Sequence, residues 1–425
     1  IPRLLELGVN ALYLGPLFES TAHGYDTLDY FHVDRRLGNN AGLKALTAEL
    51  HRNGIMAVLD GVFNHTGRHF FAFRDLAEKG RASAYGSWFS GLDFNRRSPL
   101  GDPFTYDTWA GAFDLVKLNG HNREVRNHLF EALRFWVEEF DIDGLRLDAA
   151  DQLLPDFMDE LSAFAGTLKQ DFWLLGEVVA GDYSGWARPG RLDSVTNYEL
   201  YKGLWSCLKD RNFFELAWTL NRQFGDEGLY RGQALYNFVD NHDVDRAASV
   251  LDNPAHLFPL YGLLFTVPGI PSIYYGSEYG IRGRRSKTDD SALRPAWAWP
   301  PEHYPDDISP AVDPASLSGA IARFAALRKS RAALREGSYR ELFKGHGQFA
   351  FLREIPPGGE GPERGAKLVI AVNADGREEG LRLPGMGQGR WRDILNGGEY
   401  TVSGGTLEMT IPPAWLRILE PADAG

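Results

Sequence analysis

The chain has 425 residues, is 44% hydrophobic and carries a formal net charge of −12. This length and apolar content allow a large domain with a sizeable core and an appendage. The acidic charge argues against a nucleic-acid partner, and no run approaches the roughly 20 apolar residues of a membrane span. The single cysteine, Cys207, excludes an intrachain disulfide and a cysteine metal cluster. A neutral or small-molecule partner fits this composition better.

The first two thirds of the chain alternate between predicted strands and predicted helices. The apolar, strand-like runs are 9–15, 55–60, 142–147, 172–177, 192–196, 234–239 and 270–275. The helix-like segments are 2–7, 43–52, 121–140, 155–168, 200–209, 212–224, 255–265 and 317–330. Repeated strand–helix units imply an α/β fold with a parallel sheet. Polar residues directly after the strands favour a barrel over a doubly wound sheet.

Two segments interrupt this alternation. Residues 66–120 are too long for a strand–helix loop and predict a small inserted domain. From about residue 336 onward, short apolar runs between Gly and Pro residues predict an antiparallel β-sandwich. We therefore expect a catalytic barrel at 1–65 and 121–335, an inserted domain at 66–120, and a C-terminal β-sandwich at 336–425.

The segment 142–148 predicts a short buried strand that ends in a carboxylate. Residues two apart share a face of a strand, so Arg146 and Asp148 point the same way at its carboxyl end. A neighbouring arginine is expected to keep the aspartate ionised, and a covalent nucleophile needs an ionised, positioned aspartate. Taken alone, the pair is better explained as a structural ion pair.

Four predicted strand ends carry acidic residues, and in a barrel these ends meet at one mouth. The residues are Asp60, Asp148, Glu177 and Asp243, with His65 and His242 nearby. One ionised and one protonated carboxyl group are the equipment for glycoside hydrolysis. The apolar residues before Glu177 are expected to hold its proton, which makes it the general acid/base. Asp148 is then the nucleophile, and Asp243 stabilises charge and holds the sugar.

Several short motifs along the chain resemble those of one enzyme family. DGVFNH (60–65), GLRLD (144–148), GEV (176–178) and FVDNHD (238–243) resemble the four signature regions of the α-amylase family, in the same order. GVNALYLGP (8–16), HGYD (23–26) and GIPSIYYG (269–276) resemble its other motifs. The resemblance implies a TIM barrel with an inserted domain after the third strand and a retaining mechanism, with the key carboxyls about 5–5.5 Å apart. It also implies that the sugar is bound by Tyr25, His65, Arg146 and His242. His23 is either an ordinary loop histidine or part of the site, and its place next to Gly24 and Tyr25 favours the site.

The segment LVKLN (115–119) resembles one typical of neopullulanases, cyclomaltodextrinases and maltogenic amylases. This chain has Leu-Val where that subgroup has Met-Pro. Asp290 and Arg294 match a pair that holds the next sugar in the subgroup. The Lys-His pair of many starch-degrading amylases is absent after Asp148. These features favour short or cyclic maltodextrins as substrates.

The predicted barrel strands number seven, whereas a (β/α)₈ barrel has eight. In the α-amylase family, the first strand and its loop precede a helix like the one predicted at 2–7. We therefore expect the first barrel strand to be missing from this chain. The strands at 9–15 and 270–275 would then have unpaired edges.

Three functions are compatible with these residues. We favour a retaining hydrolase of α-1,4 or α-1,6 glucosidic bonds in maltodextrins, cyclodextrins or related α-glucans. A transglycosylase or a sucrose- or trehalose-type isomerase would use the same carboxylates. A non-catalytic binding module is the third alternative, and the joint presence of Asp148, Glu177 and Asp243 argues against it.

Neither a cofactor nor a metal ion is expected to be required. Asn64 matches a calcium ligand of many α-amylases, but we expect it to bond loop backbone, because the subgroup often lacks that calcium site. Trp88, Trp109 and Trp186 are either sugar platforms or core residues. The expected partner is an α-glucan oligosaccharide, in the cytoplasm, with neither nucleic acid nor membrane involved. A homodimer is compatible with the sequence.

Overall fold

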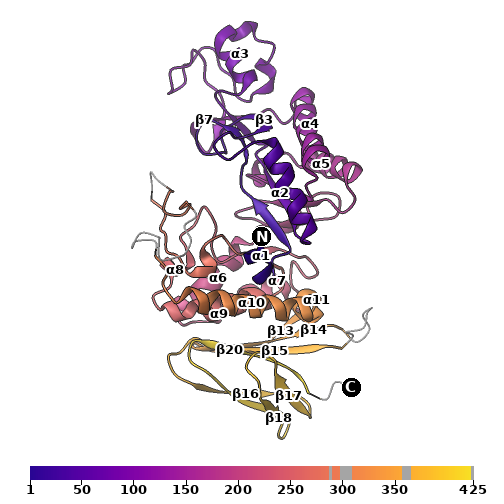
Figure 1. Ribbon diagram of the computed structural model, residues 1–425, viewed down its shortest axis with the longest axis vertical. Helices are drawn as coiled ribbons and strands as arrows, with labels where there is room; N and C mark the ends of the chain where they lie inside the picture. The colour runs from indigo at the N-terminus through magenta and orange to yellow at the C-terminus, as the bar shows by residue number, and fades with distance from the viewer. Residues whose placement is uncertain (287–289, 297–308, 357–364, 423–425) are drawn as a thin grey trace. The chain divides into compact units, whose positions relative to one another are not determined.

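The computed structural model describes residues 1–286, 290–296, 309–356 and 365–422. The chain forms two compact units, which can be followed by colour in Figure 1. The first unit comprises Ile1–Leu5 and Val9–Thr196, and the second comprises Glu6–Gly8 and Asn197–Gly425. Within the described ranges, no helix combines the length and the apolar character needed to cross a membrane.

A five-stranded parallel sheet forms the centre of the first unit. Its strands, in spatial order, are β1 (Ala11–Leu14), β4 (Met56–Gly61), β8 (Gly144–Leu147), β9 (Trp173–Gly176) and β10 (Ser194–Val195). Leu59, Leu145 and Leu174 pair in register across three neighbouring strands and are buried. Because the strands are parallel and in this register, their carboxyl ends reach one edge of the sheet together.

Helices alternate with these strands along the chain, as the sequence predicts. They are α1 (Pro2–Glu6), α2 (Asn40–Arg52), α4 (Arg123–Phe140) and α5 (Pro155–Leu168). Asn39 and Asn122 cap α2 and α4 by accepting hydrogen bonds from backbone N–H groups of the first turn. The buried face of α4 includes Trp136, whose ring stacks on Phe18 at 4.3 Å. Two short turns follow β8 and β9, namely η3 (Ala150–Gln152) and η4 (Tyr183–Gly185).

The segment between β4 and α4 forms a small antiparallel sheet and a helix. The sheet has the order β5 (His65–Gly67), β7 (Ala112–Lys117) and β6 (Thr108–Trp109). The other elements of this segment are α3 (Phe71–Lys79), η1 (Gly80–Ala82) and η2 (Gly86–Trp88). Earlier in the chain, a hairpin of β2 (Phe18–Ser20) and β3 (Thr27–Val33) precedes α2. The ring of Phe73 packs 5.0–5.9 Å from the rings of Phe89, Phe104 and Tyr106. The sequence predicted this insertion but not its helix.

The second unit combines helices with a short parallel strand pair, β11 (Tyr236–Asn237) and β12 (Ile270–Pro271). The helices are α6 (Tyr198–Lys209), α7 (Phe214–Phe224), α8 (Ala247–Val250), η5 (Pro254–His256), α9 (Leu257–Thr266), η6 (Ser277–Tyr279), α10 (Pro314–Ser330) and α11 (Ala332–Glu336). Gly262 of α9 lets Leu416 of the C-terminal sheet approach, since a Cβ there would lie 2.7 Å from the leucine side chain. Figure 1 shows α9 and α10 side by side next to the C-terminal strands.

The described C-terminal residues form two antiparallel sheets. The larger has the order β13 (Ser338–Lys344), β14 (Gln348–Glu354), β15 (Lys367–Asn373), β20 (Trp415–Pro421), β17 (Arg390–Asp393) and β18 (Glu399–Thr401). The smaller pairs β16 (Glu379–Pro384) with β19 (Thr406–Ile411). Leu352 and Val369 of one sheet share a single core with Leu383 and Leu407 of the other. This arrangement confirms the predicted β-sandwich.

The seven parallel strands in the described residues coincide with the seven strand segments predicted from the sequence. Most are shorter than predicted, and β11 and β12 have two residues each. Strands β13, β17 and β18 and helix α3 were not predicted. The three domain boundaries proposed from the sequence stay predictions.

Candidate active site

A single buried arginine joins three carboxylates at the carboxyl edge of the parallel sheet in the first unit. Arg146, on β8, is 3% exposed. Its Nη1 lies 2.8 Å from Asp148 Oδ1 and 3.0 Å from Asp60 Oδ1, and its Nη2 lies 2.9 Å from Glu177 Oε2. The structure therefore brings together Arg146, Asp148 and Glu177 and adds Asp60 from β4.

The main chain positions the two acids that follow β8 and β9. Alternation along β8 turns its leucines into the core and directs Arg146 and Asp148 away from them. The N–H groups of Asp148 and Glu177 donate to main-chain carbonyls of neighbouring strands, so the ladder continues past the strand ends. Ala149 has a left-handed backbone, with φ 45°, and its N–H donates to Glu177 Oε2 at 3.0 Å.

The charge balance around Arg146 favours the protonated form of Asp148 at neutral pH. Burial raises the pKa of Asp148 and Arg146 lowers it, while the carboxylates of Asp60 and Glu177 raise it again, so that it reaches about 8. Arg146 thus favours the ionised form of Asp148, as expected, but burial first, and then the carboxylates of Asp60 and Glu177, outweigh it.

Two tyrosine hydroxyls complete the surroundings of Asp60. The hydroxyl groups of Tyr13 and Tyr25 donate to Asp60 Oδ2 at 2.7 and 3.4 Å. The Nδ1 atom of His23 accepts a hydrogen bond from the Tyr25 N–H at 3.3 Å. Tyr25 and His23, both predicted to bind the sugar, are thus linked to the carboxylate cluster.

His65 lies against the cluster as a neutral ring. Its Nε2 is 4.0 Å from Asp148 Oδ2, and burial lowers the pKa of His65 to about 3. Asn64 Nδ2 lies 3.2 Å from His65 Nδ1. Asn64 therefore contacts the His65 ring instead of the loop backbone that we expected.

In the second unit, the four predicted site residues form one linked cluster. Arg294 Nη2 lies 3.2 Å from Asp243 Oδ1 and 3.7 Å from Asp290 Oδ2. The Nε–H of Arg294 donates to the carbonyl of His242 at 3.2 Å, and His242 Nε2 lies 3.1 Å from Asp243 Oδ2. Residues about 50 positions apart in the sequence are therefore joined around Asp243.

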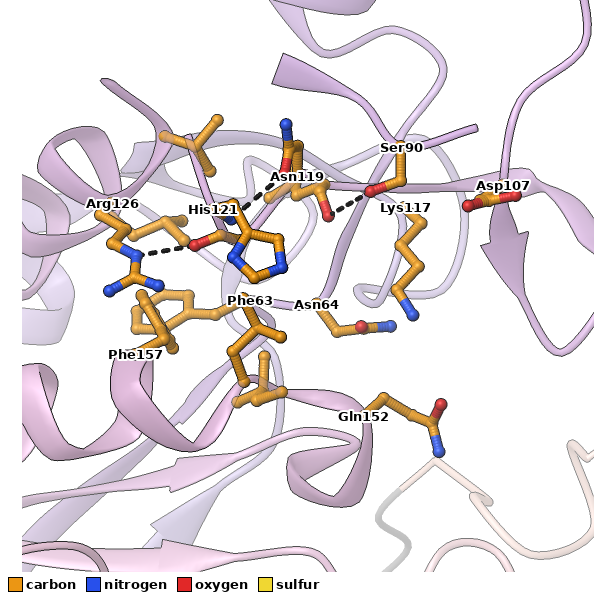
Figure 2. A pocket seen from close by; sticks show the side chains of 16 residues that line it. Phe63, Asn64, Ser90, Asp107, Lys117, Asn119, His121, Arg126, Gln152 and Phe157 are labelled. Carbon is orange, nitrogen blue, oxygen red and sulfur yellow. Dashed lines mark hydrogen bonds between the residues drawn. The ribbon is translucent and has the colours of Figure 1, made fainter. Parts of the chain in front are cut away.

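A cavity of about 210 Å³ in the first unit lies beside the LVKLN segment (Figure 2). Its polar lining includes Lys117, Asn119, Asn64 and Gln152, and the side chain of Lys117 extends toward Asn64. The carboxylates around Arg146 do not line this cavity. The LVKLN segment therefore lines a cavity next to Asn64, and that cavity excludes the carboxylates around Arg146.

No group of three or more His, Cys, Asp or Glu side chains in the described part of the chain has the arrangement of a metal site. The expectation that no metal ion or cofactor is required stays a prediction.

Sequence reasoning missed two residues of the cluster, Tyr13 and Ala149, and undervalued a third, Asp60. Asp60 was placed at a strand end but not assigned to the site. Alternation along 9–15 offered a signal for Tyr13, which lies on the face that β1 directs toward Asp60. The role of Ala149 had no signal, because alanine rarely adopts the left-handed backbone found here.

A parallel strand–helix repeat with paired carboxylates at its strand ends defines a glycosidase of the barrel type. The family model for "Alpha amylase, catalytic domain" matches residues 1–298. The chain belongs to the α-amylase family. It is therefore a glycoside hydrolase, and the fold class predicted from its sequence is confirmed.

Named relatives match the chain over nearly its whole length. Neopullulanase 2 of Thermoactinomyces vulgaris is 33% identical over 433 residues, which cover 99% of this chain and 69% of that protein. A cyclomaltodextrinase of Geobacillus thermopakistaniensis is 31% identical over 417 residues, covering 96% of this chain and 67% of that protein. The ligand-free structure of the cyclic α-maltosyl-(1→6)-maltose hydrolase from Arthrobacter globiformis matches with a TM-score of 0.80 and 28% identity, covering 99% of this chain and 87% of that one. The predicted resemblance is confirmed, and we set aside the non-catalytic alternative.

Proposed function

We propose that the protein hydrolyses α-glucosidic bonds with retention of configuration, with Asp148 as the nucleophile and Glu177 as the general acid/base. The observation that carries this assignment is the Arg146 guanidinium, which contacts both carboxylates at the ends of adjacent strands. In the first step, Asp148 bonds to the anomeric carbon, the glycosidic C–O bond breaks, and Glu177 gives its proton to the leaving oxygen. In the second step, Glu177 takes a proton from water, whose oxygen displaces Asp148.

This assignment needs one proton on the pair of acids, and the free site already retains one. The raised pKa of Asp148 puts that proton on the nucleophile near neutral pH, whereas the reaction requires it on Glu177. Both carboxylates contact the same guanidinium and therefore share one positive counter-charge. A bound sugar that favours the ionised form of Asp148 then moves the proton from Asp148 to Glu177, with no net uptake from solvent.

The other predicted residues hold the sugar in this proposal. The Nε2 atom of neutral His65, which has no hydrogen-bond partner among the described residues, is available to a sugar hydroxyl beside Asp148. We assign the same kind of role to His23, Tyr25 and His242. Asp243 stabilises the positive charge that develops on the sugar ring, while Asp290 and Arg294 hold a neighbouring sugar.

We further propose that the substrates are short or cyclic maltodextrins. Relatives named as a cyclomaltodextrinase, a neopullulanase and a cyclic maltosyl-maltose hydrolase support this substrate class. The LVKLN segment and the Asp290–Arg294 pair point to the same subgroup. Cleavage of α-1,4 bonds is the first expectation, and cleavage of α-1,6 bonds is the second.

Proton NMR of early turnover tests the mechanism. With maltotriose as the substrate, newly formed reducing ends should appear first as the α-anomer, because two displacements restore the starting configuration. First appearance of the β-anomer would overturn the retaining assignment. Product analysis on cyclodextrin, pullulan, starch and maltotriose then separates the activities, since products longer than the substrate would identify a transglycosylase and a rearranged disaccharide an isomerase.

A cytoplasmic location, a homodimer and the absence of a nucleic-acid partner remain our predictions for this enzyme. The three domain boundaries also remain predictions.

A further inference from the structure

The loop that carries His23 and Tyr25 lies outside any strand or helix. It spans residues 21–26, between β2 and β3, and the pairing of these two strands has two register shifts. Tyr25 nevertheless reaches the carboxylate cluster, where its hydroxyl donates to Asp60. Main-chain polar groups without strand or helix partners must bond to side chains or to water. The side chains that bond this loop therefore decide where Tyr25 lies.

Asp34, directly after β3, is the centre of a buried network at the base of this loop. It is 3% exposed, and Arg36 contacts both of its oxygens, with Nε 2.8 Å from Oδ1 and Nη2 against Oδ2. Ser20 donates to Oδ2 through its main-chain N–H and its hydroxyl, each at 3.2 Å. The hydrogen bond from Arg36 lowers the pKa of Asp34 far below its usual value. The two-oxygen contact also fixes the plane of the guanidinium.

The Arg36 guanidinium also bonds the main chain of the loop. Its Nη1 donates to the carbonyl of Ala22 at 2.8 Å, and its Nη2 donates to the carbonyl of Ser20 at 3.1 Å. The Ser20 hydroxyl accepts a hydrogen bond from the Gly24 N–H at 3.0 Å. Asp34 is thus tied, through one arginine and one serine, to main-chain groups at three points in and beside the loop.

A second carboxylate bonds the loop from within its own sequence. Asp26, the last residue of the HGYD motif, accepts from the N–H groups of Ala22 and His23 at 2.8 and 3.1 Å. Asp34 differs because it follows the hairpin and belongs to none of the motifs that resemble the family. The printed partners of its carboxylate are Ser20 and Arg36, so it influences the site through the loop.

We propose that Asp34 is a positioning residue, which orients Arg36 and thereby holds the loop where Tyr25 reaches Asp60 and His23 faces the substrate. This inference rests on the proposed function, because it takes Tyr25 and His23 as sugar-binding residues. A displacement of about 1 Å at a positioned group can cost about 100-fold in rate. A carboxylate that does not touch the sugar therefore controls how well the sugar is held.

Asp34→Asn tests this role with nearly the same side-chain shape. The amide turns an NH₂ group toward N–H donors and removes the charge that orients Arg36. With maltotriose as the substrate, kcat/KM should fall at least about tenfold and KM should rise at least about threefold. A loss of folded protein would lower the apparent kcat and leave KM unchanged, so the rise in KM reports displaced sugar contacts.

Arg36→Ala should reproduce the effect of Asp34→Asn. The double variant should be no worse than either single variant, because both substitutions remove the same contacts to the loop. The Arg36 side chain is 46% exposed, so this variant decides the question if Asp34→Asn does not fold. Unchanged KM in the folded variants would overturn the positioning role.

Asp143 provides a matched control at the amino end of β8. Its carboxylate accepts from the Ala57 N–H at 2.8 Å and contacts His51 at 2.7 Å and Lys169 at 2.8 Å. Asp143→Asn therefore also breaks a network of ion pairs and a main-chain hydrogen bond. It should lower the melting temperature and leave KM within about twofold. A rise in KM equal to that of Asp34→Asn would overturn the proposal.

A Tyr25→Ala background separates this inference from the proposed function. If Asp34 acts through Tyr25, Asp34→Asn should lower kcat/KM by less than about threefold in that background. A loss as large as in the parent enzyme would overturn the positioning role. Full activity of the Tyr25→Ala protein itself would instead refute the proposed sugar contacts.

Discussion

The two units each bury an arginine, and the protein satisfies the two guanidinium groups in opposite ways. Arg146, in the first unit, is surrounded by the carboxylates of Asp60, Asp148 and Glu177. Three potential negative charges therefore meet one positive charge. Burial, and after it this imbalance, raises the pKa of Asp148.

Arg246, in the second unit, is fully buried but is bound by neutral groups. It donates to the main-chain carbonyls of Tyr275 and Leu293, at 2.6 and 2.8 Å, and its guanidinium lies 4.0 Å from the Tyr274 ring centroid. Nearby Asp240 accepts from the Ala247 N–H. Arg246 thus ties together two loops, and one of them carries Arg294.

The comparison teaches that burial of an arginine does not by itself mark a reactive site. At Arg246 the printed acceptors of the two Nη groups are main-chain carbonyls and a serine hydroxyl, all neutral, and the result is a scaffold. At Arg146 the surplus of carboxylates leaves a proton that can be redistributed, as acid/base chemistry requires. The first unit therefore carries the chemistry in our account, and Arg246 supports the loop beside Asp243.

The largest expected effect comes from removing either proposed catalytic carboxyl group. Asp148→Asn and Glu177→Gln should each lower kcat/KM by at least about 10³-fold, which corresponds to roughly 4 kcal/mol of barrier. Hydrolysis of any α-glucan that the enzyme cleaves provides the measurement. Asp114→Asn, an exposed aspartate on β7, is the matched control and should be fully active. Near-normal activity of Asp148→Asn would refute the nucleophile assignment.

Asp148→Asn, which should lower activity, should raise the stability of the folded protein at high pH. Because the pKa of Asp148 rises from 3.8 to about 8 on folding, the native state holds a proton that the unfolded chain releases. Stability should therefore fall as the pH rises from about 4 to about 8, and Asp148→Asn should remove this loss. Thermal unfolding at pH 5 and pH 8 measures the effect. A variant that is less stable than the parent at pH 8 would contradict it.

Exchanging each arginine for lysine sharpens the comparison between the two units. Arg146→Lys should lower kcat/KM about 100-fold with little change in stability, because one ammonium cannot bridge three carboxylates in the same geometry. Arg246→Lys should instead lower the free energy of unfolding by about 2 kcal/mol, because bonds to buried carbonyls are lost. Denaturant unfolding and kinetics on both variants test this pattern. A large loss of stability in Arg146→Lys together with a large loss of activity in Arg246→Lys would contradict the comparison.

The pH dependence of kcat/KM should report the crowded carboxylates. Since this parameter follows ionisations of the free enzyme, and the active site keeps one proton that it loses through the raised pKa of Asp148, the alkaline limb should lie near that pKa, at about 8. Asp60→Asn removes a negative neighbour that raises the pKa of Asp148, so the limb should move to lower pH. A limb that stays in place in Asp60→Asn would show that Asp60 does not contribute to the charge imbalance.

The smallest effect expected concerns substrate size. We expect kcat/KM for a cyclodextrin to exceed that for soluble starch by about tenfold, which corresponds to roughly 1.4 kcal/mol of discrimination. Initial rates on both substrates at equal concentrations of glucosyl units give the ratio. A clear preference for starch would reject the subgroup while leaving the family intact.

The sequence predicted the parts of the site that depend on alternation along one strand. The shared face of Arg146 and Asp148 follows from the period of a strand, and the acids at strand ends follow from a parallel register. The charge state of Asp148 could not be predicted in this way. It depends on how deeply the carboxyl group is buried and on how many carboxylates share Arg146, and both require the three-dimensional arrangement.

The missed elements of the fold have similar causes. Strand β17 has one large apolar residue, Trp391, and β13 has a register shift between Glu341 and Phe343 that breaks the period of two. Helix α3 lies in an insertion held by aromatic contacts, for which no simple sequence period exists. The long helices α4 and α5 were predicted within about two residues, because their apolar stripes are continuous.

Covalent trapping tests the central claim most directly. A 5-fluoro-α-glucosyl fluoride has a leaving group that needs no acid, so the Glu177→Gln protein should form the glycosyl ester and hydrolyse it slowly. Intact mass should increase by one fluoroglucosyl group, and peptide mapping should place it on Asp148. A label on Asp60 or another carboxylate, or release of fluoride without any covalent adduct, would contradict the account.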